Sequence, residues 1–152
     1  MLTWLKQTQT LQRIVLGYWI IIPVIFYSLI GLFSLQEQVA IQHLVQSSPM
    51  IAVGNLVACL SLLQAGICYF ILKFSNSKIG VLGHYMLITL IQQLLTLNIL
   101  GVVLTLLYYR VLPSIKETIH PKLRAGVYVV GGVTLLLSMI VALVLFNLKH
   151  IG

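Results

Sequence analysis

The feature that most constrains this chain is a long run without a formal charge, Val81–Tyr109, which ends at Arg110. As one α-helix, these 29 residues would extend about 43 Å, whereas the hydrocarbon core of a bilayer is about 30 Å thick. The run is therefore long enough to cross a membrane with some tilt or overhang. We predict one transmembrane helix over residues 81–109.

Composition extends this prediction to the whole chain. Hydrophobic residues make up 60% of the 152 residues and charged residues only 7%, whereas soluble domains carry about 25% charged residues. Long apolar runs recur between short polar segments. The sequence therefore predicts an all-α fold, a bundle of four transmembrane helices with short loops, in a single integral membrane domain. The expected spans are residues 14–35, 49–74, 81–109 and 122–146.

Prolines and one loop give local predictions. Pro23 falls inside the first span, where it removes a backbone hydrogen bond and predicts a kink. Ser48 followed by Pro49 is a helix-start signal for the second span, and Pro121 can serve as the first helical residue of the fourth. Residues 36–48 have an apolar side, so they predict a short helix on the membrane surface.

Polar side chains interrupt the apolar runs at membrane depth. Gln92 and Gln93 lie on one side of the predicted third helix and Asn98 on the other, so that helix should be surrounded by protein. Either the amides line a cavity for a neutral solute or a lipid headgroup, or they hydrogen-bond between helices and fix their register. The candidate cluster is Gln64, Thr89, Gln92, Gln93, Thr96 and Asn98, with Asn55 as a further lining residue.

Small residues form a stripe along the second span. Gly54, Ala58, Ser61 and Ala65 recur at i, i+4, i+7 and i+11, which places them on one narrow face of a helix. Small side chains let a second helix backbone come close, which favours association in lipid. We interpret the stripe as a helix-packing seam, either within the chain or between chains.

Side chains that could act in catalysis, proton transfer or metal binding are scarce. The only carboxylates are Glu37 and Glu117, and both fall in predicted loops. A proton relay or a cation site at membrane depth would need ionisable or coordinating side chains there. The sequence also lacks nucleophile-elbow, phosphate-loop and metal-spacing motifs. We therefore predict a protein that is not an enzyme, with no catalytic residues, no metal site and no cofactor.

The net charge of +7 comes from nine Lys and Arg residues scattered near the ends of the apolar runs. This pattern favours anionic headgroups of a lipid bilayer over nucleic acid. With four spans, both termini lie on the same side of the membrane. The side with the termini carries five basic residues, and the opposite side carries four. This difference and a first loop free of Lys and Arg favour cytoplasmic termini in a bacterial cytoplasmic membrane, although the near balance also allows dual insertion as an antiparallel pair. The two sets are Lys6, Arg13, Lys73, Lys78 and Lys149, and Arg110, Lys116, Lys122 and Arg124.

Two functions fit these observations. The first is a small non-enzymatic membrane protein that acts through helix–helix contacts with a protein partner or as a homo-oligomer, in an accessory, regulatory, assembly or immunity-type role. The alternative is a small oligomeric transporter or channel for a neutral solute or lipid, with the amides of the third span lining its path.

Overall fold

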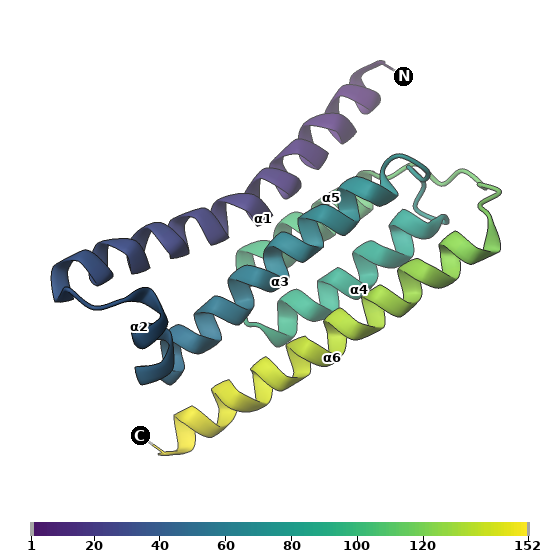
Figure 1. Ribbon diagram of the computed structural model, residues 1–152. Helices are drawn as coiled ribbons and strands as arrows, with labels where there is room; N and C mark the ends of the chain where they lie inside the picture. The colour runs from purple at the N-terminus through teal and green to yellow at the C-terminus, as the bar shows by residue number, and fades with distance from the viewer. Residues whose placement is uncertain (1, 152) are drawn as a thin grey trace.

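The computed structural model describes residues 2–151 and the side chains of residues 7–147, so the side chains of Lys6 and Lys149 lie outside the described part. Every regular element in this range is a helix. Three stretches are long and apolar enough to cross a membrane: Gln7–Glu37, Pro49–Ile71 and Pro121–Asn147. The helices are α1 (Leu2–Glu37), α2 (Ile41–Ser47), α3 (Pro49–Ile71), α4 (Val81–Leu95), α5 (Ile99–Val111) and α6 (Pro121–Ile151) (Figure 1).

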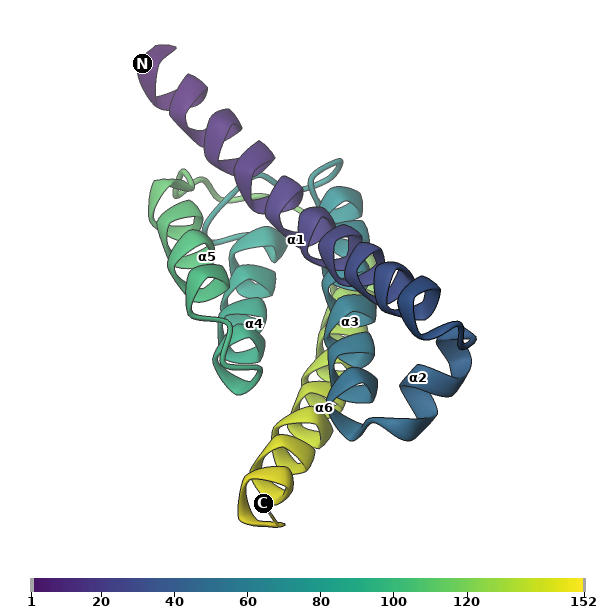
Figure 2. The same ribbon diagram turned by 90° about the vertical axis from the view of Figure 1, so that its left-hand side faces the viewer.

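The prediction of one continuous helix over residues 81–109 is wrong. The chain breaks at residues 96–98 into α4, of 15 residues, and α5, of 13 residues. Leu97 at the break has a φ of 55°, a left-handed conformation that ends α4. The two helices are about 20 Å long and lie side by side as an antiparallel hairpin (Figure 2). Neither is long enough to cross a hydrocarbon core of about 30 Å.

The base of the hairpin defines one end of the bundle, which we call the base end: residues 72–80 and 112–120. The Thr8 hydroxyl donates to the carbonyl of Val111 at 3.4 Å, which brings the first part of α1 to the base end. At the far end, Val53 at the start of α3 packs with Val141 of α6. The beginning of α1 and the end of α6 therefore lie at opposite ends of the bundle (Figures 1 and 2).

Buried Ser77 ties the two segments of the base end together. Its hydroxyl lies 3.2 Å from the carbonyl oxygen of Pro113, also contacts the carbonyl of Ile115, and accepts from the Ile115 amide at 3.1 Å. The amide of Lys78 donates to the Pro113 carbonyl at 2.8 Å. The chain entering α4 and the chain leaving α5 are thereby held together.

Glu117 makes a second connection at the base end. Its carboxylate accepts hydrogen bonds from the Ser75 hydroxyl at 2.6 Å and from the Asn76 amide at 2.8 Å. Ser75 in turn accepts from the amide of Leu82 at 3.2 Å, which satisfies one of the free amides in the first turn of α4. The carboxylate thus works as a structural acceptor beside a helix start, where negative charge is favourable.

Both proline start signals are confirmed, because Pro49 is the first residue of α3 and Pro121 the first of α6. Ser48 takes the N-cap position of α3, but its side chain makes no capping hydrogen bond. A short helix, α2, lies in the first loop as predicted. Pro23 is inside α1, which runs through it as one helix.

Candidate functional site at the helical hairpin

The tip of the hairpin, residues 96–98, is closed by hydrogen bonds within the protein. The Asn98 amide donates to the Gln93 carbonyl at 2.9 Å. The Asn98 side chain caps α5, since its Oδ1 accepts from the Gly101 amide at 3.1 Å, and it also accepts from the hydroxyl of Tyr18 on α1. An unpaired backbone group in hydrocarbon costs several kcal/mol, so a turn at membrane depth requires bonds of this kind.

The outer surface of the tip is apolar. Leu97 is 75% exposed and Ile99 77%, with Leu94 and Leu100 also more than half exposed. The hydroxyl of Thr96 turns back and donates to the carbonyl of Gln92 at 3.1 Å. The tip therefore presents leucine and isoleucine side chains outward and keeps its polar groups within the hairpin, which suits a hydrocarbon environment.

An amide pair joins α4 to α3 in the core. The Gln93 Nε2 donates to the Gln64 Oε1 at 2.8 Å, and the Tyr85 hydroxyl donates to the Gln64 carbonyl at 3.2 Å. All three side chains are at most 3% exposed. Gly101 lets α5 approach this pair, since a Cβ on it would lie 2.4 Å from the Gln93 Oε1. The pair therefore holds α3, α4 and α5 in register.

Five further polar atoms in the core have no hydrogen-bond partner among the described residues. They come from α1, α3, α4 and α5, and their side chains are at most 1% exposed. A buried polar group left unpaired costs about 1–3 kcal/mol, so bound water or a small polar solute among these helices would be stabilising. The atoms are Trp19 Nε1, Gln64 Nε2, Thr89 Oγ1, Thr105 Oγ1 and the Tyr108 hydroxyl oxygen.

The structure brings the predicted polar residues together in a different way from a single helix. Asn98 and Gln93, expected on opposite sides, contact the same core because the chain reverses direction at Leu97. Asn55 does not join them. The residues in or beside the hairpin core are Gln64, Thr89, Gln92 and Gln93, all buried, with partly buried Thr96 and Asn98 at the tip.

The small-residue stripe of α3 packs inside the chain. A Cβ on Gly54 would lie 2.4 Å from the ring of Phe26, so α1 makes its close approach to α3 there. Ala58, Ser61 and Ala65 are 1%, 3% and 6% exposed. The stripe residues are therefore packed against other parts of their own chain.

A polar patch that sequence analysis did not identify lies on the outer face of α1 and α3. The Tyr27 hydroxyl donates to the Asn55 Oδ1 at 2.8 Å and lies 3.5 Å from the Cys59 sulfur. Tyr27 is 40% exposed and Cys59 is also exposed. Asn55 and Cys59 are about 9 and 15 Å along α3 from Pro49. We call Tyr27, Asn55 and Cys59 the outer polar patch. The i, i+4 spacing of its two α3 residues was the only signal in the sequence.

Metal-ligand geometry is absent from residues 7–147, where no three His, Cys, Asp or Glu side chains come together. Comparison of the chain with protein-family models, curated proteins and solved structures finds no match. The hairpin core and the outer polar patch are therefore the two candidate functional sites among the described residues.

Proposed function

We propose that α1, α3 and α6 cross the membrane and that α4 and α5 form a re-entrant hairpin that enters from the base end. From Arg110 at the base to Asn98 at the tip, α5 covers about 18 Å. The tip then lies about 60% of the way through a core of about 30 Å. Its apolar outer surface and the hydrogen bonds made by the amides of residues 96–99 support this depth.

The charges support one orientation. The count of five basic residues against four assumed that residues 81–109 cross the membrane, and a re-entrant hairpin changes it. By the helices and loops to which they belong, all nine Lys and Arg residues except Lys149 flank the base end. Because cytoplasmic segments carry the excess of Lys and Arg, the base end is cytoplasmic, and α6 ends on the outer side.

Within this topology, we propose a non-enzymatic protein that acts by helix contact with another membrane protein or a second copy, as an accessory, regulatory, assembly or immunity-type subunit. The outer polar patch is the observation that carries this function. Polar side chains that face lipid are costly, and Asn side chains commonly hydrogen-bond between membrane helices. The Asn55 Nδ2 donates to no described residue, so an acceptor on a docked helix would complete the patch.

The native cysteines give a direct test. Cys59 is exposed within the patch and Cys68 is buried, so a short thiol cross-linker applied to native membranes should react at Cys59. We expect one discrete adduct, either a dimer or a complex with one partner, that Cys59→Ser abolishes. Asn55→Leu should reduce the adduct several-fold, whereas Leu56→Ala, a matched exposed position outside the patch, should not. Absence of an adduct, or an adduct indifferent to Asn55→Leu, would contradict the proposal.

A transporter or channel is the second candidate. The five buried polar atoms of α1, α3, α4 and α5 that lack a hydrogen-bond partner among the described residues favour it. These hydroxyl, amide and indole groups offer hydrogen bonds to a neutral solute. Reconstituted vesicles test this function through flux of small neutral solutes. Thr89→Val and Thr105→Val, which keep side-chain shape, should abolish flux, as should Gln93→Leu. The control is Thr134→Val, since the Thr134 hydroxyl already donates to the carbonyl of Gly131 at 2.8 Å in α6. No flux from the wild type would reject the transporter.

A further inference from the structure

A groove of about 530 Å³ runs along the outer face of the protein between α3 and α6, close to the base end. Apolar side chains and two glycines, Gly66 and Gly126, line it, and among the described residues of its wall only Lys122 is charged. A Cβ on either glycine would meet no atom within 4 Å. The glycines therefore border open space, unlike Gly54 and Gly101, which are packed against neighbours.

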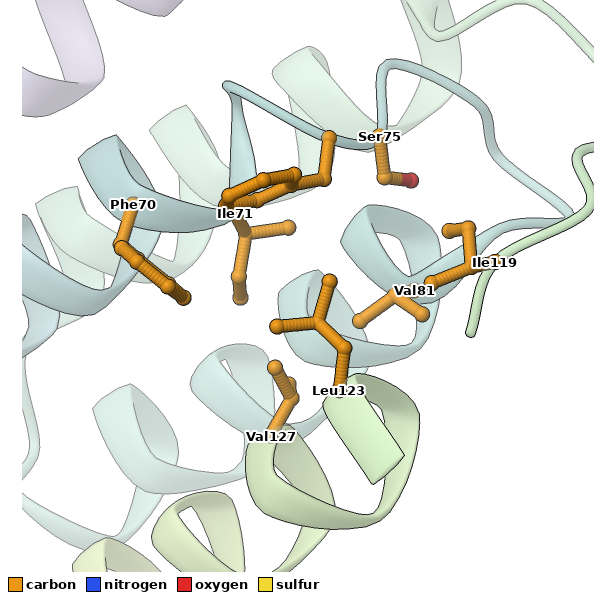
Figure 3. A pocket seen from close by; sticks show the side chains of 8 residues that line it. Phe70, Ile71, Ser75, Val81, Ile119, Leu123 and Val127 are labelled. Atoms are coloured by element: carbon orange, nitrogen blue, oxygen red, sulfur yellow. The ribbon is translucent and has the colours of Figure 1, made fainter. Parts of the chain in front are cut away.

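The groove has no opening into the bundle beside its base end. There Leu123 and Val127 of α6 point toward Ile71 of α3 and Val81 of α4 (Figure 3), and the space between them has no room for a water molecule. Leu123 and Val127 line the groove and also belong to this packed set of side chains. A molecule in the groove is thus held on the outer surface and faces the lipid.

The length of the groove matches the part of a lipid that lies in one leaflet. Its α6 wall runs from Lys122 to Val130, about 12 Å along the helix, which is close to the depth of one leaflet, about 15 Å. Its volume of about 530 Å³ leaves room along that length for an acyl chain. The apolar lining and the match to the depth of one leaflet therefore suit a lipid tail.

Charge identifies the headgroup. Lys122 is exposed at the second position of α6, where the chain meets the headgroup layer. Of the two carboxylates in the sequence, Glu117 is hydrogen-bonded to Ser75 and Asn76. Glu37 ends α1 at the far end of the bundle. The Lys122 ammonium therefore has no carboxylate partner among the described residues, and an anionic group is its natural counter-ion.

We propose that this groove is a binding site for one anionic phospholipid of the base-end leaflet. An acyl chain lies between Gly66 and Gly126, and the lipid phosphate is bound by Lys122. The site is separate from the outer polar patch and from the hairpin core, so it rests on the proposed membrane topology but not on either proposed activity.

Native mass spectrometry of the purified full chain with phosphatidylglycerol or phosphatidylcholine tests this site. We expect one phosphatidylglycerol to be retained, and Lys122→Gln to reduce its retention about fivefold, to the level of phosphatidylcholine. Gly66→Leu and Gly126→Leu fill the groove and should abolish retention. Gly132→Leu is the matched control, because it also introduces a side chain into open space on α6 but outside the groove. Circular dichroism should give the same helix content for all four variants.

Four results would overturn the proposal. The first is retention of phosphatidylglycerol that Gly126→Leu leaves unchanged. The second is equal retention of the two lipids by the wild type, unaffected by Lys122→Gln. The third is a dimer mass that Gly126→Leu abolishes, which would assign the groove to a helix of a second copy. Competition by soluble glycerol phosphate would also contradict it, since the proposed site requires an acyl chain.

Discussion

The hydroxyl of Tyr18 on α1 donates a hydrogen bond to the Asn98 Oδ1 at the tip of the hairpin. The same oxygen accepts from the amide of Gly101 at 3.1 Å. One side chain therefore caps α5 and joins the tip to a neighbouring helix. The position of the chain reversal is thus fixed by a contact from outside the hairpin as well as by its own turn.

This shared oxygen predicts coupling between Tyr18 and Asn98. Asn98→Ala should cost about 1–2 kcal/mol of unfolding free energy through the lost cap. Tyr18→Phe should cost about 1 kcal/mol through the lost hydrogen bond. The double variant should lose less than the sum, because both changes remove the same bond. Equilibrium unfolding in mixed micelles measures these values, with Tyr69→Phe at an exposed site as the control. Full additivity would contradict the bond.

Replacing Leu97 by glycine should stabilise the fold. Its φ of 55° is left-handed, which costs a residue with a side chain about 1–2 kcal/mol. Because the Leu97 side chain is 75% exposed, Leu97→Gly should lose little packing and raise the unfolding free energy by about 1 kcal/mol. Leu94→Gly, in the regular helix beside it, should lower it by about 1 kcal/mol. Equal losses in both variants would exclude the left-handed turn.

Two glycines should respond to alanine in opposite directions. A Cβ on Gly83 would lie 1.8 Å from the carbonyl oxygen of Lys78, a backbone atom fixed by the base-end hydrogen bonds. Gly83→Ala should therefore lower the unfolding free energy by more than about 2 kcal/mol. Gly132 borders open space, so Gly132→Ala should raise it by about 0.5–1 kcal/mol through helix propensity. Similar effects from both variants would show that α4 does not start against residue 78.

Ser77 should protect the base end from proteolysis. Ser77→Ala removes the acceptor for the Ile79 and Ile115 amides, and each unpaired amide costs about 1–3 kcal/mol. Residues 112–120 should then detach, and trypsin should cleave after Lys116 several-fold faster in detergent solution. Ser114→Ala, at an exposed position in the same segment, should leave the cleavage rate unchanged. Equal rates in both variants would mean that Ser77 does not hold this segment.

Much of the helical framework could be predicted from the sequence. Apolar runs longer than about 18 residues identify membrane-spanning candidates without reference to tertiary structure. The starts of α3 and α6 follow from Pro49 and Pro121, because proline fits the first helical position, where no amide donor is needed.

The break inside residues 81–109 had only indirect signals. Its turn contains neither glycine nor proline, and leucine is a poor candidate for a left-handed conformation. Two features were compatible with it: the run is about 9 residues longer than one span needs, and Asn98 is a favourable N-cap. Amides on both sides of one assumed helix were a third sign, since a chain reversal turns both toward one core.

The outer polar patch could not be predicted because it depends on tertiary packing. Tyr27 and Asn55 meet because α1 approaches α3 closely where Gly54 contacts Phe26. The same packing separates Asn55 from the amides of the hairpin core. Residue type and helical spacing alone give no information on which helix lies beside which.

The most direct test of the account is the side of the membrane on which two loops lie. Asn76→Cys and Ser114→Cys are introduced separately into a chain with Cys59→Ser and Cys68→Ala, and each variant is labelled with a membrane-impermeant maleimide. A re-entrant hairpin predicts that both sites react from the same, cytoplasmic face, and that Ser47→Cys reacts from the opposite face. Labelling of Ser114→Cys and Asn76→Cys from opposite faces would mean that residues 81–109 cross the membrane completely, which contradicts the account.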